Sequence, residues 1–430
     1  MSNPENDWQE VESASSRKMK DWLVSLTEKT CASTEQDDFP KTLIILDNDY
    51  GELTTVLYLI QGQPCFSRSK LVLSPRVYQK NKNVLPNRVE MWETEEDLLQ
   101  HITSFEPDIL LLAAGYLMPV HDLLSNEALE RVCLKAKEYD ATIITADPFL
   151  GLLSEWSTKG LDNIISIDIP TDADENLVTI KRQADLKLHT ELAGANAYLK
   201  EFLHLYPTYT DMEGITSFPS DEKNRSFFND QLVIPSDLQT TSSDDKPHWI
   251  FIISEVDFQT QSMHLGVPRF ITHVIDLLTQ GANLGRKIIF LGPSSLIQIL
   301  RASEATAGYD IHLFNFGAYE IVMSLLLTAE YSFYWNVVSH TILIQLWNGR
   351  PVVLLDKGHL ARSIPSLYER VISWYYQSWE PSYFDQNERI SLEKLTEYVE
   401  QHATQKAALM KAYRRAPSPE SLFKSLIEGK

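Results

Sequence analysis

Short runs of apolar residues alternate along the chain with segments of helical periodicity, and this pattern predicts an α/β fold. Strands that are apolar throughout and are separated by helices are typical of a parallel sheet covered on both faces. In the first half the expected strands are residues 42–46, 70–73, 89–92, 109–114, 141–145 and 164–167. The expected helices are residues 53–60, 94–104 and 126–139, and 177–205 reads as one or two further helices.

The same alternation starts again near residue 247, which predicts a second sheet. Its expected strands are residues 249–253, 287–291, 311–314, 331–334 and 351–355. A chain of 430 residues is long for one hydrophobic core and suits two domains. We therefore expect an α/β protein of two Rossmann-like domains whose parallel sheets face a central cleft.

The composition of the segments sets the expected domain boundaries. Residues 1–40 are polar, with one amphipathic helical patch near Met19–Leu26 that could pack on the first domain. The first Rossmann-like domain is expected at 41–205 and the second at 247–390. Residues 206–246 are rich in Ser, Thr, Asp, Asn and Pro and read as a linker or mobile excursion. The helices of 391–430 are expected to brace the first domain.

The charge balance excludes whole classes of partner. The chain has 38 basic and 59 acidic residues, a net charge of −21, and no local Lys/Arg stripe. Such a chain repels nucleic acid and anionic membrane surfaces. The polar N-terminus does not resemble a signal peptide, and the longest apolar runs are far shorter than the roughly 20 residues of a membrane span. We expect a cytoplasmic protein with no membrane span and no nucleic-acid partner.

Motifs for metals and common cofactors are missing from the sequence. Cys31, Cys65 and Cys133 lie far apart without a CxxC pair, so they are expected to be reduced thiols. The eleven histidines form no HExxH motif, and no structural metal is expected. The chain also lacks GxGxxG and Walker A motifs, which argues against a dinucleotide enzyme or a P-loop kinase.

Residues 286–362 contain four elements that follow one another in a definite order. A strand ends in the glycine turn Leu291–Pro293, and a short strand leads into His312–Gly317. A further strand closes on the polar residues of Ser332–Thr341, and Asn348–Val353 (NGRPVV) contains G-x-P-x-V. In this order and spacing the segment resembles the C-terminal half of a GT-B glycosyltransferase. The loop Asp47–Leu53 (DNDYGEL) is similar to the Gly-bearing first loop of such enzymes, which receives the acceptor.

The resemblance has two departures. The His-Gly-Gly element that commonly precedes the donor helix is replaced by YWNVVSHT at residues 334–341, and there is no E-x₇-E pair of the retaining type. The resemblance implies that the second domain holds a nucleotide-sugar donor and the first an acceptor, whose identity is unknown. It implies sugar transfer without a cofactor or metal, with a carboxylate as the base.

The donor-side candidates follow the carboxyl ends of the second-domain strands, where ligands bind in open α/β sheets. Backbone N–H groups, hydroxyls and cations there could hold a diphosphate. Each has a structural alternative: an N-cap for Ser339 or Thr341, core packing for Phe316, a surface ion pair for Lys357 and a plain turn for Gly292. The candidates are Gly292, Ser294, Asn315, Phe316, Asn336, Ser339, His340, Thr341, Lys357, Gly358, His359 and Arg362.

The acceptor-side candidates are three carboxylates in one loop, Asp49, Asp47 and Glu52, with Asp49 placed first. Carboxylates this close raise one another's pKa, which suits a general base that deprotonates an acceptor hydroxyl. The alternative is capping and dipole compensation at the start of a helix. His121 is interpreted as a polar residue at a helix start rather than a catalyst.

Two other functions stay open at this stage. The chain could be a non-catalytic GT-B-like protein that binds a partner, for which the missing His-Gly-Gly element and the aromatic segment 375–379 leave room. It could also be a nucleotide-sugar epimerase or hydrolase on the same fold.

Overall fold

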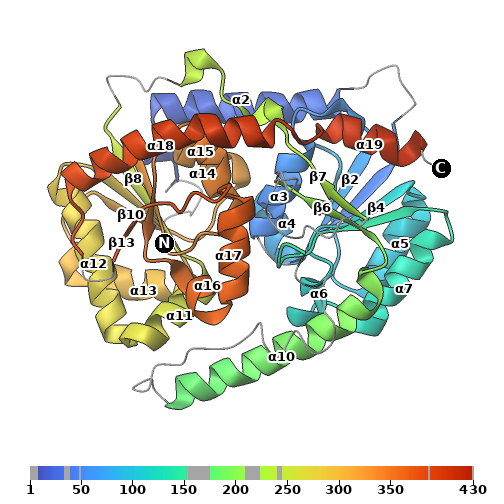
Figure 1. Cartoon of the computed structure of the whole chain (residues 1–430), viewed down its shortest axis with the longest axis horizontal. Helices are drawn as coiled ribbons and strands as arrows, with labels where there is room; N and C mark the ends of the chain where they lie inside the picture. The colour runs from blue at the N-terminus through green and yellow to red at the C-terminus, as the bar shows by residue number, and fades with distance from the viewer. Residues whose placement is uncertain are drawn as a thin grey trace.

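Two parallel β-sheets lie side by side, each with helices packed on both faces (Figure 1). The computed structural model describes residues 8–32, 39–47, 50–151, 153, 175–208, 223–239, 245–385 and 388–428. The first sheet has seven strands in the order β3-β2-β1-β4-β5-β6-β7, and the second has six in the order β10-β9-β8-β11-β12-β13. This confirms the predicted fold class of two Rossmann-like α/β domains.

The first sheet is built around β1, whose four residues are all buried because the sheet is covered on both faces. Thr42 of β1 pairs with Ser69 on one side and with Ile109 on the other. The strands are β1 (Thr42–Ile45), β2 (Ser69–Leu73), β3 (Val89–Met91), β4 (Ile109–Leu112), β5 (Thr142–Thr145), β6 (Leu203–Tyr206) and β7 (Asn224–Ser226). The helices between them are α3 (Tyr50–Ile60), α4 (Pro75–Asn81), α5 (Glu95–Phe105), α6 (Leu117–Val120), α7 (Asn126–Lys137) and α10 (Glu175–Leu199).

The second sheet repeats this plan around β8, which pairs with β9 and β11. Its strands are β8 (His248–Ile252), β9 (Lys287–Leu291), β10 (Ile311–Phe314), β11 (Tyr331–Tyr334), β12 (Val352–Leu355) and β13 (Tyr383–Phe384). Its helices are α11 (Glu255–Leu265), α12 (Val267–Asn283), α13 (Ser294–Ala302), α14 (Tyr319–Thr328), α15 (His340–Trp347), α16 (Gly358–Ser363) and α17 (Pro365–Trp374).

The first sheet extends further along the chain than the sequence pattern indicates. Residues 203–205, expected to be helical, belong to β6, and β7 lies inside the segment interpreted as a linker. The polar edge strand β7 (Asn-Arg-Ser) lacks the apolar pattern by which strands are recognised, but β6 pairs with it through His204, Leu205 and Tyr206. The expected strand at 164–167 lies outside the described residues.

Helices from both ends of the chain connect the two domains. The helix α2 (Ala14–Cys31) and the pair α18 (Leu392–Tyr413) and α19 (Pro419–Glu428) run along one side of both sheets (Figure 1). At one end of α2 the Asp245 carboxylate accepts the Ala14 N–H at 3.1 Å, and at the other the Leu26 carbonyl accepts the Gly62 N–H at 3.1 Å. The helix also packs against α14 of the second domain, so it contacts both domains, while α19 packs its Phe423 ring against Phe66 of the first domain, with 4.6 Å between the ring centroids.

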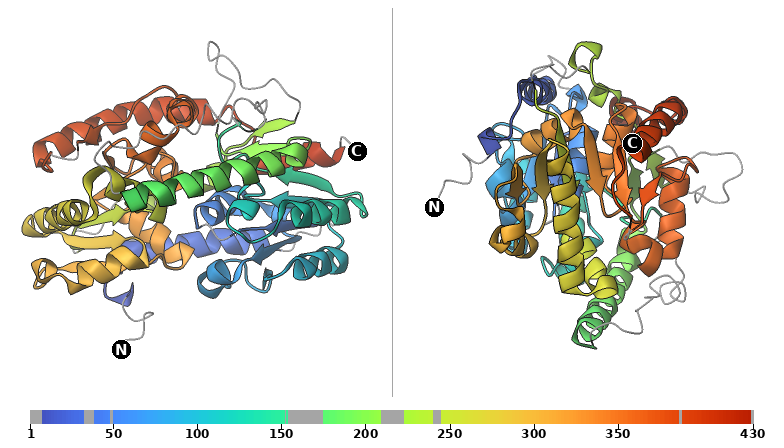
Figure 2. Two further views of the ribbon diagram at one scale, coloured as in Figure 1. Left: turned by 90° about the horizontal axis from the view of Figure 1, so that it is seen from below. Right: turned by 90° about the vertical axis from the view of Figure 1, so that its left-hand side faces the viewer.

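The long helix α10 lies along another edge of the molecule, apart from these connecting helices. It is below both sheets in Figure 1 and in front of them when the molecule is seen from below (Figure 2). None of the helices in the described ranges is long and apolar enough to cross a membrane. In the same ranges, no three His, Cys, Asp or Glu side chains gather in a way that could hold a metal ion.

The three cysteines should differ in reactivity. Burial raises the pKa of Cys65 and of Cys133 to about 12, and it also raises the pKa of the half-buried Cys31, which the nearby Arg88 partly offsets. Because the thiolate is the reactive form, we expect a thiol reagent at pH 8 to modify at most Cys31 in the native protein and all three thiols after denaturation. The Cys31→Ala variant is the control. Rapid modification of two native thiols would contradict this burial.

Candidate functional site

A pocket with a volume of about 90 Å³ lies between the two domains. One wall comes from the first turns of α3 in the first domain. The other walls come from the last residues of β8, β9 and β11, from the loop between β10 and α14, from α14 itself and from the start of α15. The lining residues are Gly51, Leu53, Thr54, Ile252, Leu291, Phe316, Gly317, Tyr319, Val322, Met323, Leu326, Tyr334, Ser339 and Thr341. None of these described residues is charged, so the pocket is apolar with a few hydroxyl groups.

A chain of hydroxyls forms the polar wall of this pocket, at the start of α15. The Thr341 hydroxyl lies 2.7 Å from the Ser339 hydroxyl and 2.9 Å from that of Tyr334. The Tyr334 hydroxyl in turn accepts a hydrogen bond from Gln345 Nε2 at 2.6 Å. Hydroxyls beside the N-terminus of a helix form an uncharged environment that suits an anion. Two candidates named from the sequence, Ser339 and Thr341, thus share one wall with Tyr334 at the end of β11.

Asn336 holds the loop that leads into α15 instead of lining the pocket. Its Oδ1 accepts the N–H groups of Val338 at 3.2 Å and Ser339 at 3.3 Å. Its Nδ2 donates to Asp257 Oδ2 at 2.6 Å, and that carboxylate is fully buried. The side chain fixes the backbone on which Ser339 and Thr341 are placed.

His340 faces the core between the domains and does not line the pocket. Its ring is buried among aromatic rings, with centroids 4.4 Å from Tyr58, 5.8 Å from Trp347 and 6.4 Å from Tyr375. Neither ring nitrogen has a hydrogen-bond partner among the described residues. Burial lowers the pKa of His340 to about 3, so the imidazole is neutral. This arrangement gives it a packing role between α15 and α3.

The buried imidazole should make stability depend on pH. In the folded state the pKa is about 3, below the ordinary 6.5, so the unfolded chain binds one more proton between these values. The stability that comes from the neutral ring is present above pH 6.5 and is lost as pH falls, by about 2 kcal/mol at pH 5. Urea denaturation at pH 7.5 and at pH 5 measures this effect. Between the two pH values the free energy of unfolding should fall by about 2 kcal/mol less in His340→Phe than in the wild type. Equal losses in both proteins would contradict the burial of His340.

The turn after β12 is held by local contacts. Lys357 forms an ion pair with Glu380, with 2.5 Å between Nζ and Oε1. Gly358 has a φ of 75°, and a Cβ there would lie 2.6 Å from the Trp335 carbonyl oxygen, so the turn packs directly on the β11 loop. The side chains of His359 and Arg362 lie outside the described part of the structure.

The turns after β9 and β10 are joined to each other. Asn315 Nδ2 donates to the Ser294 hydroxyl at 2.7 Å, and Asn315 Oδ1 accepts the Phe316 N–H at 2.8 Å. The Phe316 ring lines the pocket, and its carbonyl accepts a hydrogen bond from Lys80 of the first domain. At Gly292 a Cβ would lie 2.6 Å from the Phe290 ring. Of these four candidates only Phe316 lines the pocket.

A carboxylate–histidine pair lies at the carboxyl edge of the first sheet. Asp47, which follows β1, is fully buried, and its Oδ2 lies 2.8 Å from His121 Nδ1. His121 follows α6, in the connection after β4, and its side chain is about one-third exposed. Since β1 and β4 are neighbours where the strand order reverses, the pair occupies the position at which open α/β sheets bind ligands.

The three carboxylates expected to cluster after β1 are not seen together among the described residues. Asp49 lies outside the described residues. Glu52 is half-buried on α3. The burial of Tyr375 in the second domain raises the pKa of that tyrosine, and the charge of Glu52 raises it further. Asp47 pairs with a histidine, and His121 ends α6 instead of starting a helix. A buried carboxylate bound to Nδ1 favours the imidazole tautomer with its proton on Nδ1, in which Nε2 is the basic nitrogen.

Comparisons with known proteins show similarity at the level of architecture. No family model matches the sequence, and no curated protein matches it. Among solved structures, UGT2 of Phytolacca americana, complexed with UDP-2fluoro-glucose and pterostilbene, covers 92% of this chain and 100% of its own, at 10% identity and a TM-score of 0.48. HepE of Anabaena in complex with UDP-glucose covers 90% and 100%, at 11% identity and a TM-score of 0.44. MurG of Acinetobacter baumannii covers 91% and 100%, at 9% identity and a TM-score of 0.40.

Proposed function

We propose that this protein is a glycosyltransferase that moves a sugar from a nucleotide-sugar donor to an acceptor hydroxyl. The donor would lie along the carboxyl edge of the second sheet, with its diphosphate at the hydroxyl wall of the pocket, whose volume of about 90 Å³ holds only part of such a molecule. The acceptor would lie at the carboxyl edge of the first sheet, beside His121. The observation that carries this proposal is the pairing of a partly exposed His121 with the fully buried Asp47 at the strand-order reversal of the first sheet.

The pair suits one-base chemistry. With Nδ1 held by the Asp47 carboxylate, Nε2 of His121 would remove the proton of the acceptor hydroxyl as its oxygen forms a bond to the anomeric carbon. The bond from that carbon to the donor phosphate oxygen breaks, and the nucleoside diphosphate leaves with the electron pair. The proton ends on His121, where the buried carboxylate stabilises the imidazolium. Transfer by a single displacement inverts the anomeric centre.

The second domain would stabilise the leaving diphosphate without a large positive charge. The Ser339 and Thr341 hydroxyls and the N-terminal N–H groups of α15 are donors suited to phosphate oxygens. Across the domain boundary, Lys80 already contacts the Phe316 carbonyl. Burial and the nearby charge of Arg76 lower the pKa of Lys80, and this lysine would bring a first-domain cation to this edge of the pocket.

One observation favours a second candidate, a non-catalytic binding protein of the same architecture. The described lining residues of the pocket are uncharged and largely apolar, and Lys357 is paired with Glu380. Such a pocket also suits an uncharged apolar ligand. The transferase must bind a nucleoside diphosphate, whereas the binding protein has no need to.

Thermal unfolding with a panel of nucleoside diphosphates and their sugars tests the proposal. A ligand at 100 times its Kd should stabilise the protein by about 2.7 kcal/mol. The Thr341→Val variant, which removes the shared hydroxyl at nearly constant volume, should weaken that stabilisation. Thr190→Val on the exposed face of α10 is the matched control and should not. If no nucleotide stabilises the protein, the transferase proposal fails and the binding-protein candidate is favoured.

A further inference from the structure

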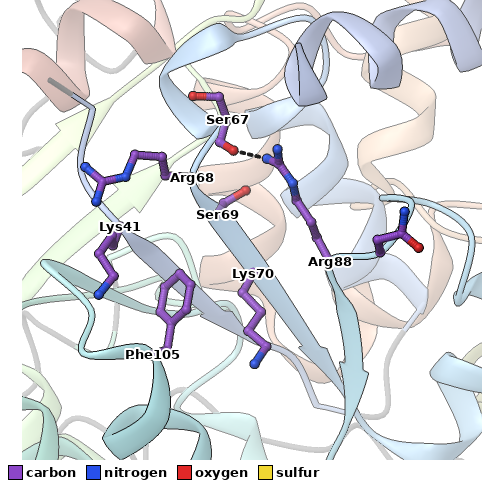
Figure 3. Close-up of a pocket in the computed structure, with 8 residues that line it drawn as sticks. Lys41, Ser67, Arg68, Ser69, Lys70, Arg88 and Phe105 are labelled. Atoms are coloured by element: carbon purple, nitrogen blue, oxygen red, sulfur yellow. Dashed lines mark hydrogen bonds between the residues drawn. The ribbon is translucent and has the colours of Figure 1, made fainter. Parts of the chain in front are cut away.

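A second pocket, of about 400 Å³, lies on the first domain at the edge of the sheet opposite to His121 (Figure 3). Its residues come from the amino ends of three neighbouring strands, β1, β2 and β3, and from the end of α5. They are Lys41, Ser67, Arg68, Ser69, Lys70, Asn87, Arg88 and Phe105. Because the strands have three to five residues at about 3.3 Å each, this edge is roughly 10–17 Å from the carboxyl edge. The pocket is separate from the site between the domains.

The charge of this pocket is opposite to that of the chain. Four of its eight lining residues are Lys or Arg and none of these described residues is acidic, whereas the whole chain carries −21. Two carboxylates lie next to it. Glu90 pairs with Lys70, with 2.6 Å between Oε1 and Nζ, and Asp108 accepts the backbone N–H of Lys41 at 2.7 Å. Among the described residues, four cationic side chains thus line the pocket and two carboxylates contact its lysines.

The two arginines are held in place by backbone carbonyls. Arg88 donates to the Ser67 carbonyl and, at 3.3 Å, to the Cys31 carbonyl. Arg68 donates to the Phe39 carbonyl at 2.9 Å. A guanidinium that is already fixed loses little side-chain freedom when it binds a ligand. Guanidinium groups also match the geometry of phosphate oxygens and can bind them through two parallel hydrogen bonds.

The Phe105 ring adds an apolar wall between two of the cations. The Nζ of Lys41 lies 5.4 Å from the ring centroid and that of Lys70 lies 5.8 Å from it. Figure 3 shows the ring between the two lysines, with Arg68 and Arg88 on either side of the strand start. The volume is within the range of small-molecule sites and exceeds what one phosphate ion would fill.

We propose that this amino-edge pocket binds a phosphate-bearing organic ligand, with its phosphoryl groups among Lys41, Arg68, Lys70 and Arg88 and its organic part against Phe105. The same chemistry is offered by a soluble phosphoester and by a phosphorylated lipid headgroup. The site is independent of the proposed transfer reaction, because it lies at the opposite edge of the sheet.

Titration calorimetry with inorganic pyrophosphate, and sedimentation with phosphatidylcholine vesicles containing phosphatidic acid, test this proposal. The wild type should bind at least one probe with a Kd below about 1 mM, which corresponds to about −4 kcal/mol. The Lys41→Gln/Arg68→Gln variant should bind at least tenfold more weakly. Arg68 is changed in preference to Arg88, because Arg88 donates to the backbone carbonyls of Ser67 and Cys31, whereas Arg68 donates to that of Phe39 alone among the described carbonyls.

The matched control removes the same number of charges from the same domain. The variant Lys135→Gln/Lys137→Gln removes two lysines of α7. The Nζ of Lys137 lies 4.8 Å from the Phe202 ring centroid, much as that of Lys41 lies near the Phe105 ring. This control should bind like the wild type. Binding of pyrophosphate points to a soluble ligand, and binding of vesicles alone points to a lipid headgroup. Binding of neither probe, or equal weakening in both variants, would overturn the proposal.

Discussion

Replacement of His121 by alanine is expected to lower the rate of sugar transfer by about 10²–10⁴-fold, the usual contribution of a general base. The acceptor hydroxyl would lose the group that takes its proton, while the donor pocket, on the other domain, is unchanged. The buried Asp47 carboxylate would also lose this contact, so the variant should be less stable than the wild type, and kcat is compared at a temperature at which both proteins are folded. The kcat is measured as release of nucleoside diphosphate in the presence of an acceptor panel.

The Asp47→Asn variant separates catalysis from packing in the same pair. An amide occupies nearly the same volume but cannot stabilise an imidazolium, so kcat should again fall while donor binding persists. Thermal stabilisation by the donor is the control in both variants. Wild-type transfer rates in His121→Ala would exclude His121 as the base and leave the first-domain loop without an assigned role.

The largest effect on stability is expected at Trp347, and the Trp347→Ala variant should lower the free energy of unfolding by about 3–5 kcal/mol. Its indole is 1% exposed and packs against three rings. The centroid-to-centroid distances are 5.2 Å to Tyr58, 5.1 Å to Phe228 and 4.8 Å to Tyr413. These rings come from the first domain, the segment after β7 and α18, so the cavity would lie where the two domains meet.

Urea denaturation measures this loss, with two further variants for comparison. Trp347→Phe should cost less, because it keeps an aromatic ring and removes an indole N–H that has no hydrogen-bond partner among the described residues. Ile180→Ala, on an exposed position of α10, should change stability by less than about 0.5 kcal/mol. If Trp347→Ala were as stable as Ile180→Ala, the domains would not share this aromatic contact.

Most of the fold could be predicted from the sequence because its central strands are buried on both faces. Segments such as 43–45, 109–112 and 288–291 are continuous apolar runs, and helices with apolar faces lie between them. The strands β6 and β7 could not be recognised in this way. The strand β6 directly follows the long helix α10, and the polar β7 depends on pairing with β6, a tertiary contact.

The candidate site was predicted only in part. Of the residues named from the sequence, Phe316, Ser339 and Thr341 line the pocket. The direction of His340 depends on how α15 packs against α3, which local sequence does not determine. The contact between Asp47 and His121 joins residues 74 positions apart. The signal that could have found it is the strand order of a Rossmann-like sheet, which makes the first and fourth strands neighbours and brings the loops after them together.

Hydrogen–deuterium exchange with and without a stabilising nucleoside diphosphate tests the central claim most directly, because it locates the bound nucleotide. The account predicts slower exchange in the segments that follow β9, β10 and β11, including Gly317 and the first turn of α15 with Ser339 and Thr341. Protection confined to the amino-edge pocket around Arg68, or no protection at any segment, would contradict a donor site on the second domain.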